Sequence, residues 1–288
     1  MSTRKQLKQL VEARSGLIVP GAFNALSARV IADLGFKAIY VTGAGVTNMW
    51  FGLPDQGFMG LAEIADHTAR IRDAVNLPLI VDADTGFGNA LNVRHAVRTL
   101  ERAGADCIQL EDQVAPKRCG HLDGKEVIPR GQFVAKIRAA LEARRDPAFL
   151  VIARTDARAM LGLDEAVERA RAALAAGADM VFVEAAQSME ELESIPRRVE
   201  GPCLLNIVRG GKTPDLSLAA AQDMGYRMAI LPSLLIGAAA SACEQALSTL
   251  RSTGQPPSSA QGPGVAERFR RLGADEWDAL RTRFDDAQ

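Results

Sequence analysis

The sequence has no long hydrophobic run, no paired cysteines and no excess of charge of either sign. Its formal net charge is −1 over 288 residues, so it lacks the basic character that draws a protein to nucleic acid or to an anionic membrane. No stretch approaches the ~20 apolar residues that a membrane-spanning helix needs. The charged first residues also lack the apolar segment of a signal peptide. We therefore expect a cytoplasmic protein whose partners are neither nucleic acids nor membranes.

The four cysteines stand at positions 107, 119, 203 and 243. They lie far apart in the chain and form no CxxC pair, which argues against a disulfide framework and against a zinc site. Reduced thiols fit this spacing better. We expect Cys107, Cys203 and Cys243 to act as small buried hydrophobic residues, whereas Cys119 has a different setting.

What the sequence does have is a regular alternation of short apolar runs and longer helical patterns. Helical patterns include residues 91–103, 164–176 and 215–224, and two patterns end in Ala-Gly-Ala-Asp, where glycine can end the helix in a left-handed conformation. The eight apolar runs are residues 17–19, 38–41, 79–81, 107–110, 149–152, 180–183, 203–205 and 228–231. Eight strand–helix units predict an α/β fold, a (β/α)8 TIM-type barrel with its helices outside.

A doubly wound open sheet is the alternative fold. It would carry a nucleotide-binding glycine motif after an early strand, but residues 43–48, the nearest candidate, lack the third glycine of that motif.

We assign the barrel to residues 1–251. Residues 252–264 are rich in Ser, Gly, Pro and Gln and are predicted to be a linker. Residues 265–288 are predicted to be a C-terminal helical tail that docks on its own barrel or on a neighbouring subunit. Trp277, Leu280 and Phe284 can share one face of this tail.

Acidic residues stand where several of these strands end, and the carboxyl ends of the strands form the active face of a parallel barrel. Asp82 and Asp84 are two residues apart in an extended segment, so both can face the rim from one side. Carboxylate oxygens of this kind suit Mg²⁺, with Mn²⁺ as a second possibility. Glu111 and Glu184 could hold the waters of that cation. The alternative is a set of acids that cap helix N-termini.

One short motif after the fourth strand carries a cysteine between cations and a histidine. It reads Lys117-Arg118-Cys119-Gly120-His121. Nearby positive charge favours a thiolate, so the motif predicts a lowered pKa for Cys119. Gly120 would let the backbone come close to a ligand. A cytoplasmic enzyme would use such a cysteine as an acid, a base or a nucleophile; the alternative is an exposed basic loop with an incidental cysteine.

Several motifs in residues 16–250 resemble those of the isocitrate lyase and phosphoenolpyruvate mutase superfamily. They are Pro20–Ala25, Asp82–Gly88, Glu111–Gln113, Lys117–His121 and Ala153–Ala157. The cysteine in the fourth-strand loop marks the carbon–carbon lyase branch. The resemblance implies a homotetramer, a dimer of dimers, in which the last helix packs on a partner subunit.

The resemblance also implies site residues. It implies Mg²⁺ at Asp82 and Asp84, and a loop around Cys119 that closes over a small hydroxy-dicarboxylate or hydroxy-tricarboxylate. The backbone of Thr42, Gly43 and Ala44 would hold a pyruvate carboxylate. Other positions that match the ligand site are Asp55, Arg154, Glu184 and Asn206.

We expect a retro-aldol, Claisen-type cleavage of a 2-hydroxy acid into pyruvate and a carboxylate. Bound Mg²⁺ would lower the pKa of the 2-hydroxyl group, and Tyr40 is the candidate proton acceptor. Arg154 and His121 would stabilise the carbanion. Cys119 would then donate a proton to it.

Two loops bear on the substrate. Methylisocitrate lyases carry an arginine shortly after the eighth strand, but residues 232–237 contain no cation. We therefore expect a 2-alkylmalate such as 2,3-dimethylmalate, with 2-methylisocitrate as the alternative if Arg209 supplies the missing charge. Residues 209–212 are cationic and glycine-rich and lie near the place where such barrels bind phosphate, so a phosphonomutase is another alternative. An oxaloacetate-acting enzyme and a non-catalytic carboxylate sensor are further alternatives.

Overall fold

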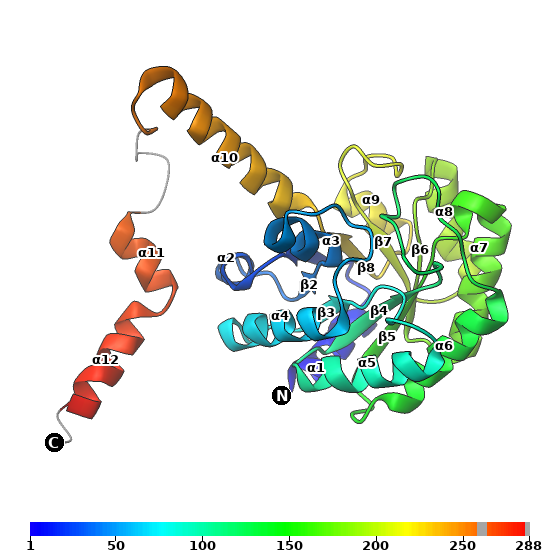
Figure 1. The fold of residues 1–288 in the computed structure, drawn as a ribbon. Helices are drawn as coiled ribbons and strands as arrows, with labels where there is room; N and C mark the ends of the chain where they lie inside the picture. Colours follow the sequence, from blue (N-terminus) through cyan, green and yellow to red (C-terminus); the bar gives the residue numbers. More distant parts are fainter. Residues whose placement is uncertain (258–263, 286–288) are drawn as a thin grey trace. The chain divides into compact units, whose positions relative to one another are not determined.

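Eight parallel strands close into a barrel in which each strand pairs with the next and β8 pairs with β1 (Figure 1). The computed structural model describes residues 1–257 and 264–285. The strands are β1 (Leu17–Ala22), β2 (Ile39–Val41), β3 (Leu79–Asp82), β4 (Cys107–Glu111), β5 (Leu150–Thr155), β6 (Met180–Val183), β7 (Cys203–Asn206) and β8 (Met228–Leu231). The predicted (β/α)8 barrel is confirmed, and the doubly wound open sheet is wrong.

Helices connect successive strands and lie around the barrel (Figure 1). In the barrel part of the chain they are α1 (Thr3–Glu12), α2 (Ala25–Asp33), α3 (Gly43–Val46), the π-helix η1 (Thr47–Phe51), α4 (Leu61–Ala74), α5 (Ala90–Arg102), α6 (Arg130–Ala143), α7 (Arg158–Ala175), α8 (Met189–Val199) and α9 (Leu218–Asp223). Gly104 and Gly177, which follow α5 and α7, have φ angles of 98° and 105°. Both are the left-handed helix ends that the sequence predicted.

The strands bury both of their faces, which explains why they appear in the sequence as continuous apolar runs. Along β2, Ile39 and Val41 belong to a core that includes residues of the surrounding helices, whereas Tyr40 belongs to a second core inside the barrel. Leu7 and Val11 of α1 also belong to this second core. Helix α1 therefore packs where the strands begin, and the opposite, carboxyl ends carry the polar loops.

The C-terminal residues 237–288 form a compact unit of their own, distinct from residues 1–236. It contains most of α10 (Leu234–Thr253), then α11 (Val265–Arg271) and α12 (Ala274–Asp285). The predicted linker, residues 252–264, begins in the last residues of α10; its residues 258–263, and 286–288 of the tail, lie outside the described residues. The end of the barrel at residue 251 stays a prediction.

The cysteines differ in burial. Cys107 and Cys203 are buried, as expected, but Cys243 is exposed. The expectation for Cys243 was wrong because α10 buries none of its residues in this chain. Among the described helices, none is both long and apolar enough to cross a membrane.

Candidate active site

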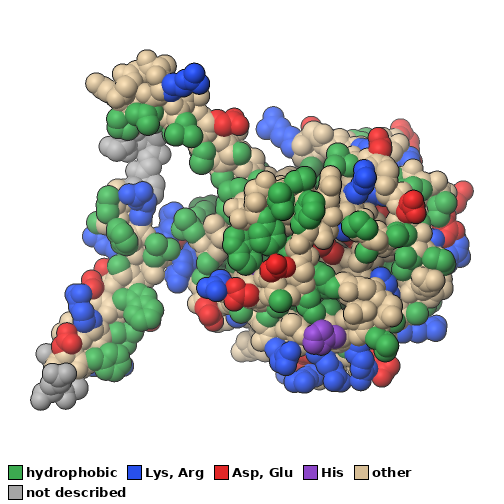
Figure 2. All heavy atoms as spheres, viewed as in Figure 1, with side chains coloured by type: hydrophobic (Ala, Val, Ile, Leu, Met, Phe, Trp, Pro, Cys, Tyr) green, Lys and Arg blue, Asp and Glu red, His purple; other side chains and the backbone are tan. Residues whose placement is uncertain are grey.

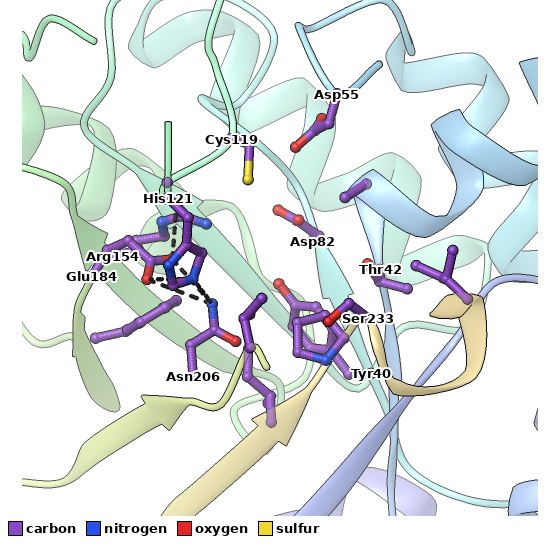
Figure 3. Close-up of a pocket in the computed structure, with 17 residues that line it drawn as sticks. Tyr40, Thr42, Asp55, Asp82, Cys119, His121, Arg154, Glu184, Asn206 and Ser233 are labelled. Carbon is purple, nitrogen blue, oxygen red and sulfur yellow. Dashed lines mark hydrogen bonds and ion pairs between the residues drawn. The ribbon is translucent and has the colours of Figure 1, made fainter. Parts of the chain in front are cut away.

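A cavity of about 90 Å³ opens at the carboxyl ends of the strands (Figure 3). Most of the predicted site residues line it. They are Tyr40, Thr42, Ala44, Asp55, Asp82, Cys119, Gly120, His121, Arg154, Glu184 and Asn206. These residues come from separate strands and loops, so the barrel brings together side chains that are more than 160 positions apart in the sequence.

The two carboxylates predicted to bind metal lie beside the start of α3. Asp82 ends β3, and its Oδ1 accepts hydrogen bonds from Asp84 N at 3.2 Å and from Gln109 Nε2 at 3.3 Å. Gly43 comes so close that a Cβ there would lie 3.0 Å from Asp82 Oδ2. A side chain at position 43 would therefore have to displace the carboxylate by a few tenths of an ångström.

Lys117 joins this acidic cluster to the loop that carries Cys119. Its Nζ lies 2.5 Å from Asp55 Oδ1 and 2.9 Å from Asp84 Oδ1. Burial opposes the charge on Lys117, but Asp84 and Asp55 hold its pKa well above the ordinary value. Burial also raises the pKa of Asp84 to about 6, against the opposing effect of Lys117.

The donor set fits a hard divalent cation. Carboxylates outnumber cations among the described residues in and directly around the cavity: Asp55, Asp82, Asp84, Glu111, Asp156 and Glu184 face Lys117, Lys125 and Arg154. Glu111 Oε1 is buried and accepts no hydrogen bond from any described residue. The described residues contain no cluster of three or more His, Cys, Asp or Glu side chains able to hold a metal. Asp82 and Asp84 would thus supply two oxygen ligands, and Mg²⁺ commonly keeps waters or substrate in its other positions.

Arg154 is held by three carboxylates on the opposite side of the cavity. Its Nε and Nη2 donate to Asp156 Oδ2 and Oδ1 at 2.9 and 3.0 Å. Its Nη1 lies 3.3 Å from Glu111 Oε2, and its Nη2 lies 3.1 Å from Glu184 Oε2. Burial opposes the charge, but these carboxylates, Asp156 most of all, keep the pKa of Arg154 well above its ordinary value. The guanidinium is therefore a permanent cation in one fixed orientation.

The loop that carries Cys119 closes directly onto this guanidinium. A Cβ at Gly120 would lie 2.4 Å from Arg154 Nη2 and 2.6 Å from Glu184 Cγ, so only glycine allows the contact. Lys125, which is buried in the same loop, donates a hydrogen bond to the Gly120 carbonyl and lies 3.7 Å from Asp156 Oδ1. The loop is thus bonded to itself and to the carboxylate that holds Arg154.

The environment of Cys119 differs from the sequence expectation. Burial raises the pKa of its thiol, although a hydrogen bond from the backbone of His121 opposes the shift. The two flanking cations do not act on the sulfur: Arg118 is exposed, and Lys117 is bound to Asp55 and Asp84. The predicted lowering of the pKa is therefore wrong, because desolvation outweighs a charge that points elsewhere. A protonated thiol is suited to act as an acid.

The tautomer of His121 follows from its partners. The Lys212 backbone N–H donates to Nδ1 at 3.0 Å, so Nδ1 carries a lone pair and the ring proton sits on Nε2. Nε2 lies 3.5 Å from Glu184 Oε1 and 3.4 Å from Asn206 Nδ2. Burial lowers the pKa of His121, so the ring is neutral near pH 7 and offers an N–H rather than a charge.

Two other predicted residues have contrasting positions. The buried hydroxyl of Tyr40 donates to Gln109 Oε1 at 2.8 Å, and burial, followed by the charge of Asp82, raises its pKa well above the ordinary value. Arg209 is exposed and does not line the cavity. The wall of the cavity near the end of β8 is mainly apolar. It is formed by Val208, Ile230, Pro232 and Ile236, with the hydroxyl of Ser233 beside them.

Sequence reasoning assigned no role to three buried polar residues around the cavity: Gln109, Lys125 and Asp156. Gln109 was detectable as a single amide in the apolar run 107–110, and Asp156 as the acid two residues after Arg154 in an extended segment. Lys125 lies in a polar loop, where nothing in the sequence distinguishes it from a solvated lysine.

Comparison with known proteins agrees with this geometry. The profile of the family described as phosphoenolpyruvate phosphomutase matches residues 7–251. The chain is 43% identical to a 2,3-dimethylmalate lyase of Eubacterium barkeri, over 82% of each chain. It is 45% identical to a 2-methylisocitrate lyase of Aeropyrum pernix, over 86% of this chain and 80% of that one.

A solved structure of a 2,3-dimethylmalate lyase superposes with a TM-score of 0.93 at 36% identity, covering 98% of this chain and 95% of the other. That protein is described as a member of the PEP mutase/isocitrate lyase superfamily. The matches extend over the whole barrel and include every element that carries a cavity residue. This chain belongs to the phosphoenolpyruvate mutase/isocitrate lyase superfamily.

Proposed function

We propose that the protein is a Mg²⁺-dependent carbon–carbon lyase that cleaves a 2-alkylmalate, such as 2,3-dimethylmalate, into pyruvate and a carboxylate. One observation carries the proposal: Cys119, whose burial raises its pKa, lines the same cavity as Asp82 (Figure 3). An acid and carboxylate oxygens that could bind a metal in the wall of one small cavity suit the cleavage of a carbon–carbon bond in a substrate bound there. The similarity to named lyases supports this reading.

Asp82 and Asp84 would hold the cation, and Glu111 and Glu184 would accept hydrogen bonds from its waters. When bound, Mg²⁺ would polarise the substrate's carboxylate and 2-hydroxyl oxygens and lower the pKa of the hydroxyl. The excess of carboxylates over cations in and around the cavity supports the binding of a divalent cation there.

The chain's own residues would bind the substrate and move its protons. The backbone at Thr42, Gly43 and Ala44, where α3 begins, would bind the carboxylate of the pyruvate half. As the bond between carbons 2 and 3 breaks, its electron pair stays on carbon 3. Arg154 and the Nε2–H of His121 would stabilise that charge. The Cys119 thiol would then donate its proton to carbon 3, and a proton returned to the sulfur would complete the cycle.

The sequence predicted Tyr40 as the acceptor for the proton of the 2-hydroxyl, and Tyr40 lines the cavity. Because its own hydroxyl donates to Gln109, the phenol can accept a hydrogen bond from the 2-hydroxyl but not its proton. The closed loop would keep bulk water away from the carbanion, which water would otherwise protonate. Gly120 supports this arrangement, because the glycine lets the loop pack on Arg154.

The shape and polarity of the cavity support a substrate with two carboxylates. Burying an unpaired carboxylate is costly, and the wall formed by Val208, Ile230, Pro232 and Ile236 offers it no cation. An alkyl group fits that wall. The 45% identity to a 2-methylisocitrate lyase favours a second candidate, in which exposed Arg209 would have to turn inward to bind the third carboxylate.

A substrate panel tests the proposal: 2,3-dimethylmalate, 2-ethylmalate, 2-methylisocitrate, isocitrate and oxaloacetate, with pyruvate, glyoxylate, oxalate or acetate detected. We expect the highest kcat/KM on a 2-alkylmalate. A kcat/KM at least tenfold higher on 2-methylisocitrate would support the second candidate, and Arg209→Met should then raise the KM for that substrate alone. Cleavage of none of the substrates would contradict the proposed lyase activity.

We also propose that the protein is a cytoplasmic homotetramer in which the C-terminal helix packs on a neighbouring subunit. Figure 2 shows hydrophobic side chains at the surface of the C-terminal helices. The exposed apolar residues of α10, α11 and α12 include Leu247, Leu250, Phe269, Trp277 and Phe284. Exposed apolar surface of this extent suggests a protein–protein interface. A second copy of the chain is the partner that the resemblance implies.

A further inference from the structure

The buried amide of Gln109 lies between Tyr40 and Asp82, two residues that line the cavity. Gln109 is fully buried, and in the pairing of β3 with β4 it is the direct neighbour of Asp82. Its Nε2 lies 3.3 Å from Asp82 Oδ1, and Tyr40 Oη lies 2.8 Å from its Oε1. A buried amide is costly unless its groups are hydrogen-bonded, and both ends of this one have a partner.

The direction of these two hydrogen bonds follows from the chemistry of the groups. An ionised carboxylate can only accept, so Gln109 must turn its NH₂ toward Asp82. Its carbonyl oxygen then faces Tyr40, which must donate its proton. The hydrogen bonds described for Asp82, from Asp84 N and from Gln109, both reach Oδ1. The other oxygen, Oδ2, is the one that a Cβ at Gly43 would meet at 3.0 Å.

We propose that Gln109 is a positioning residue that fixes Asp82 and Tyr40 relative to each other. This inference rests on the proposed function, in which Asp82 holds the divalent cation. Gln109 engages Oδ1 and leaves Oδ2 free for that cation, so the carboxylate does not have to reorient on binding. An oriented ligand binds more tightly because less rotational freedom is lost.

The same amide restricts the part that Tyr40 can play. While the phenol donates to Gln109 Oε1, its oxygen keeps lone pairs that can accept a hydrogen bond from the substrate's 2-hydroxyl. A phenolate would face the carbonyl oxygen of Gln109 at 2.8 Å and the nearby charge of Asp82. Tyr40 therefore orients the substrate hydroxyl as a neutral phenol, and it does not form a phenolate while Gln109 is in place.

Metal binding to the substrate-free protein tests the proposal without reference to activity. Gln109→Met keeps the length of the side chain and removes both hydrogen bonds. We expect its Kd for Mn²⁺, measured on metal-stripped protein from the electron paramagnetic resonance of free Mn²⁺, to rise about tenfold, the lower end for residues that orient a ligand. Tyr40→Phe should raise Kd about threefold, the lower end for one net hydrogen bond. The double variant should be no weaker than Gln109→Met alone.

Gln113→Met is the matched control. Gln113 is also a buried glutamine that follows β4, but its amide binds the backbone of Arg118 at 2.9 Å in both directions. Its Kd for Mn²⁺ should stay within about twofold of wild type, since neither hydrogen bond reaches Asp82. An equal loss of Mn²⁺ affinity in Gln113→Met would mean that any disturbance of the buried core near β4 weakens metal binding. That result would overturn the proposal.

The remaining outcomes separate the inference from the proposed function. If wild type binds Mn²⁺ and folded Gln109→Met binds it equally well, the positioning role is wrong and the lyase proposal stands. If wild type binds no Mn²⁺, both are wrong. If Gln109→Met does not fold, Tyr40→Phe tests the proposal instead. An unchanged Kd for Mn²⁺ in Tyr40→Phe would contradict the positioning of Asp82 and Tyr40 by Gln109.

Discussion

A Cβ at Gly120 would lie 2.4 Å from Nη2 of Arg154. The loop with the cysteine motif and the end of β5 therefore meet with no space for even a methyl group. This contact puts the Cys119 thiol and the Arg154 guanidinium in the wall of one cavity. Cys119, the proposed acid, and Arg154, the proposed stabilising cation, can act on the same carbon only while Gly120 is in contact with Arg154.

Gly120→Ala should keep the loop from closing. The added methyl group cannot fit between Arg154 and Glu184, so kcat should fall by at least about a hundredfold, the cost of a misplacement near 1 Å. Pyruvate formation measures the effect. The control is Gly131→Ala, where a Cβ would meet nothing within 4 Å. A near-normal kcat in Gly120→Ala would mean that closure is not required.

Removing divalent metal should abolish turnover. The site combines Asp82 and Asp84 with a nearby acidic excess, and a cation is needed to polarise the substrate oxygens. EDTA treatment followed by gel filtration should give inactive protein, and MgCl₂ or MnCl₂ should restore activity. Unchanged far-ultraviolet circular dichroism would exclude unfolding as the cause. Full turnover in a sample shown by elemental analysis to be metal-free would contradict the prediction.

Cys119→Ser should lower kcat about a hundredfold or more, as expected when a general acid is lost. A hydroxyl has nearly the size of the thiol but a far higher pKa, so pyruvate should still bind with similar affinity. Cys243→Ser, at an exposed position on α10, is the control and should behave as wild type. A Cys119→Ser enzyme with normal kcat would show that another group delivers the proton.

The pH dependence of kcat should report the raised pKa of Cys119. The proton donor must be protonated, and burial moves its pKa above the ordinary thiol value of 9.0. The loss of activity that this group causes should therefore have its midpoint above pH 9, with activity unaffected by it near neutral pH. A fall centred near pH 7 that disappears in Cys119→Ser would indicate a lowered pKa, as the sequence alone had suggested.

Deleting residues 255–288 should weaken assembly. Trp277 and Phe284 are exposed in the single chain, and a partner subunit that covers them would gain apolar contact area. Light scattering after size exclusion should give a smaller assembly for the truncated protein at equal concentration. The same molar mass and the same Tm as the full chain would show that the tail is not needed for assembly.

The sequence by itself determined the barrel and the location of the site. Strands buried on both faces appear as continuous apolar runs, glycines such as Gly104 and Gly177 end the helices between them, and parallel strands must bring their carboxyl ends to one face. Asp82, Arg154 and Glu184 therefore had to converge. The motif at 117–121 and the other local motifs also sufficed to indicate the superfamily.

Only the tertiary structure decided the chemistry of the individual groups, because pKa values and hydrogen bonds depend on burial and on neighbours from distant parts of the chain. Cys119 has two cations beside it in sequence, yet its pKa is raised, since Lys117 binds Asp55 and Asp84 and the sulfur is desolvated. The contact of Gln109 with Tyr40 crosses 69 positions of the sequence. No local pattern encodes these distances; the packing of the strands does.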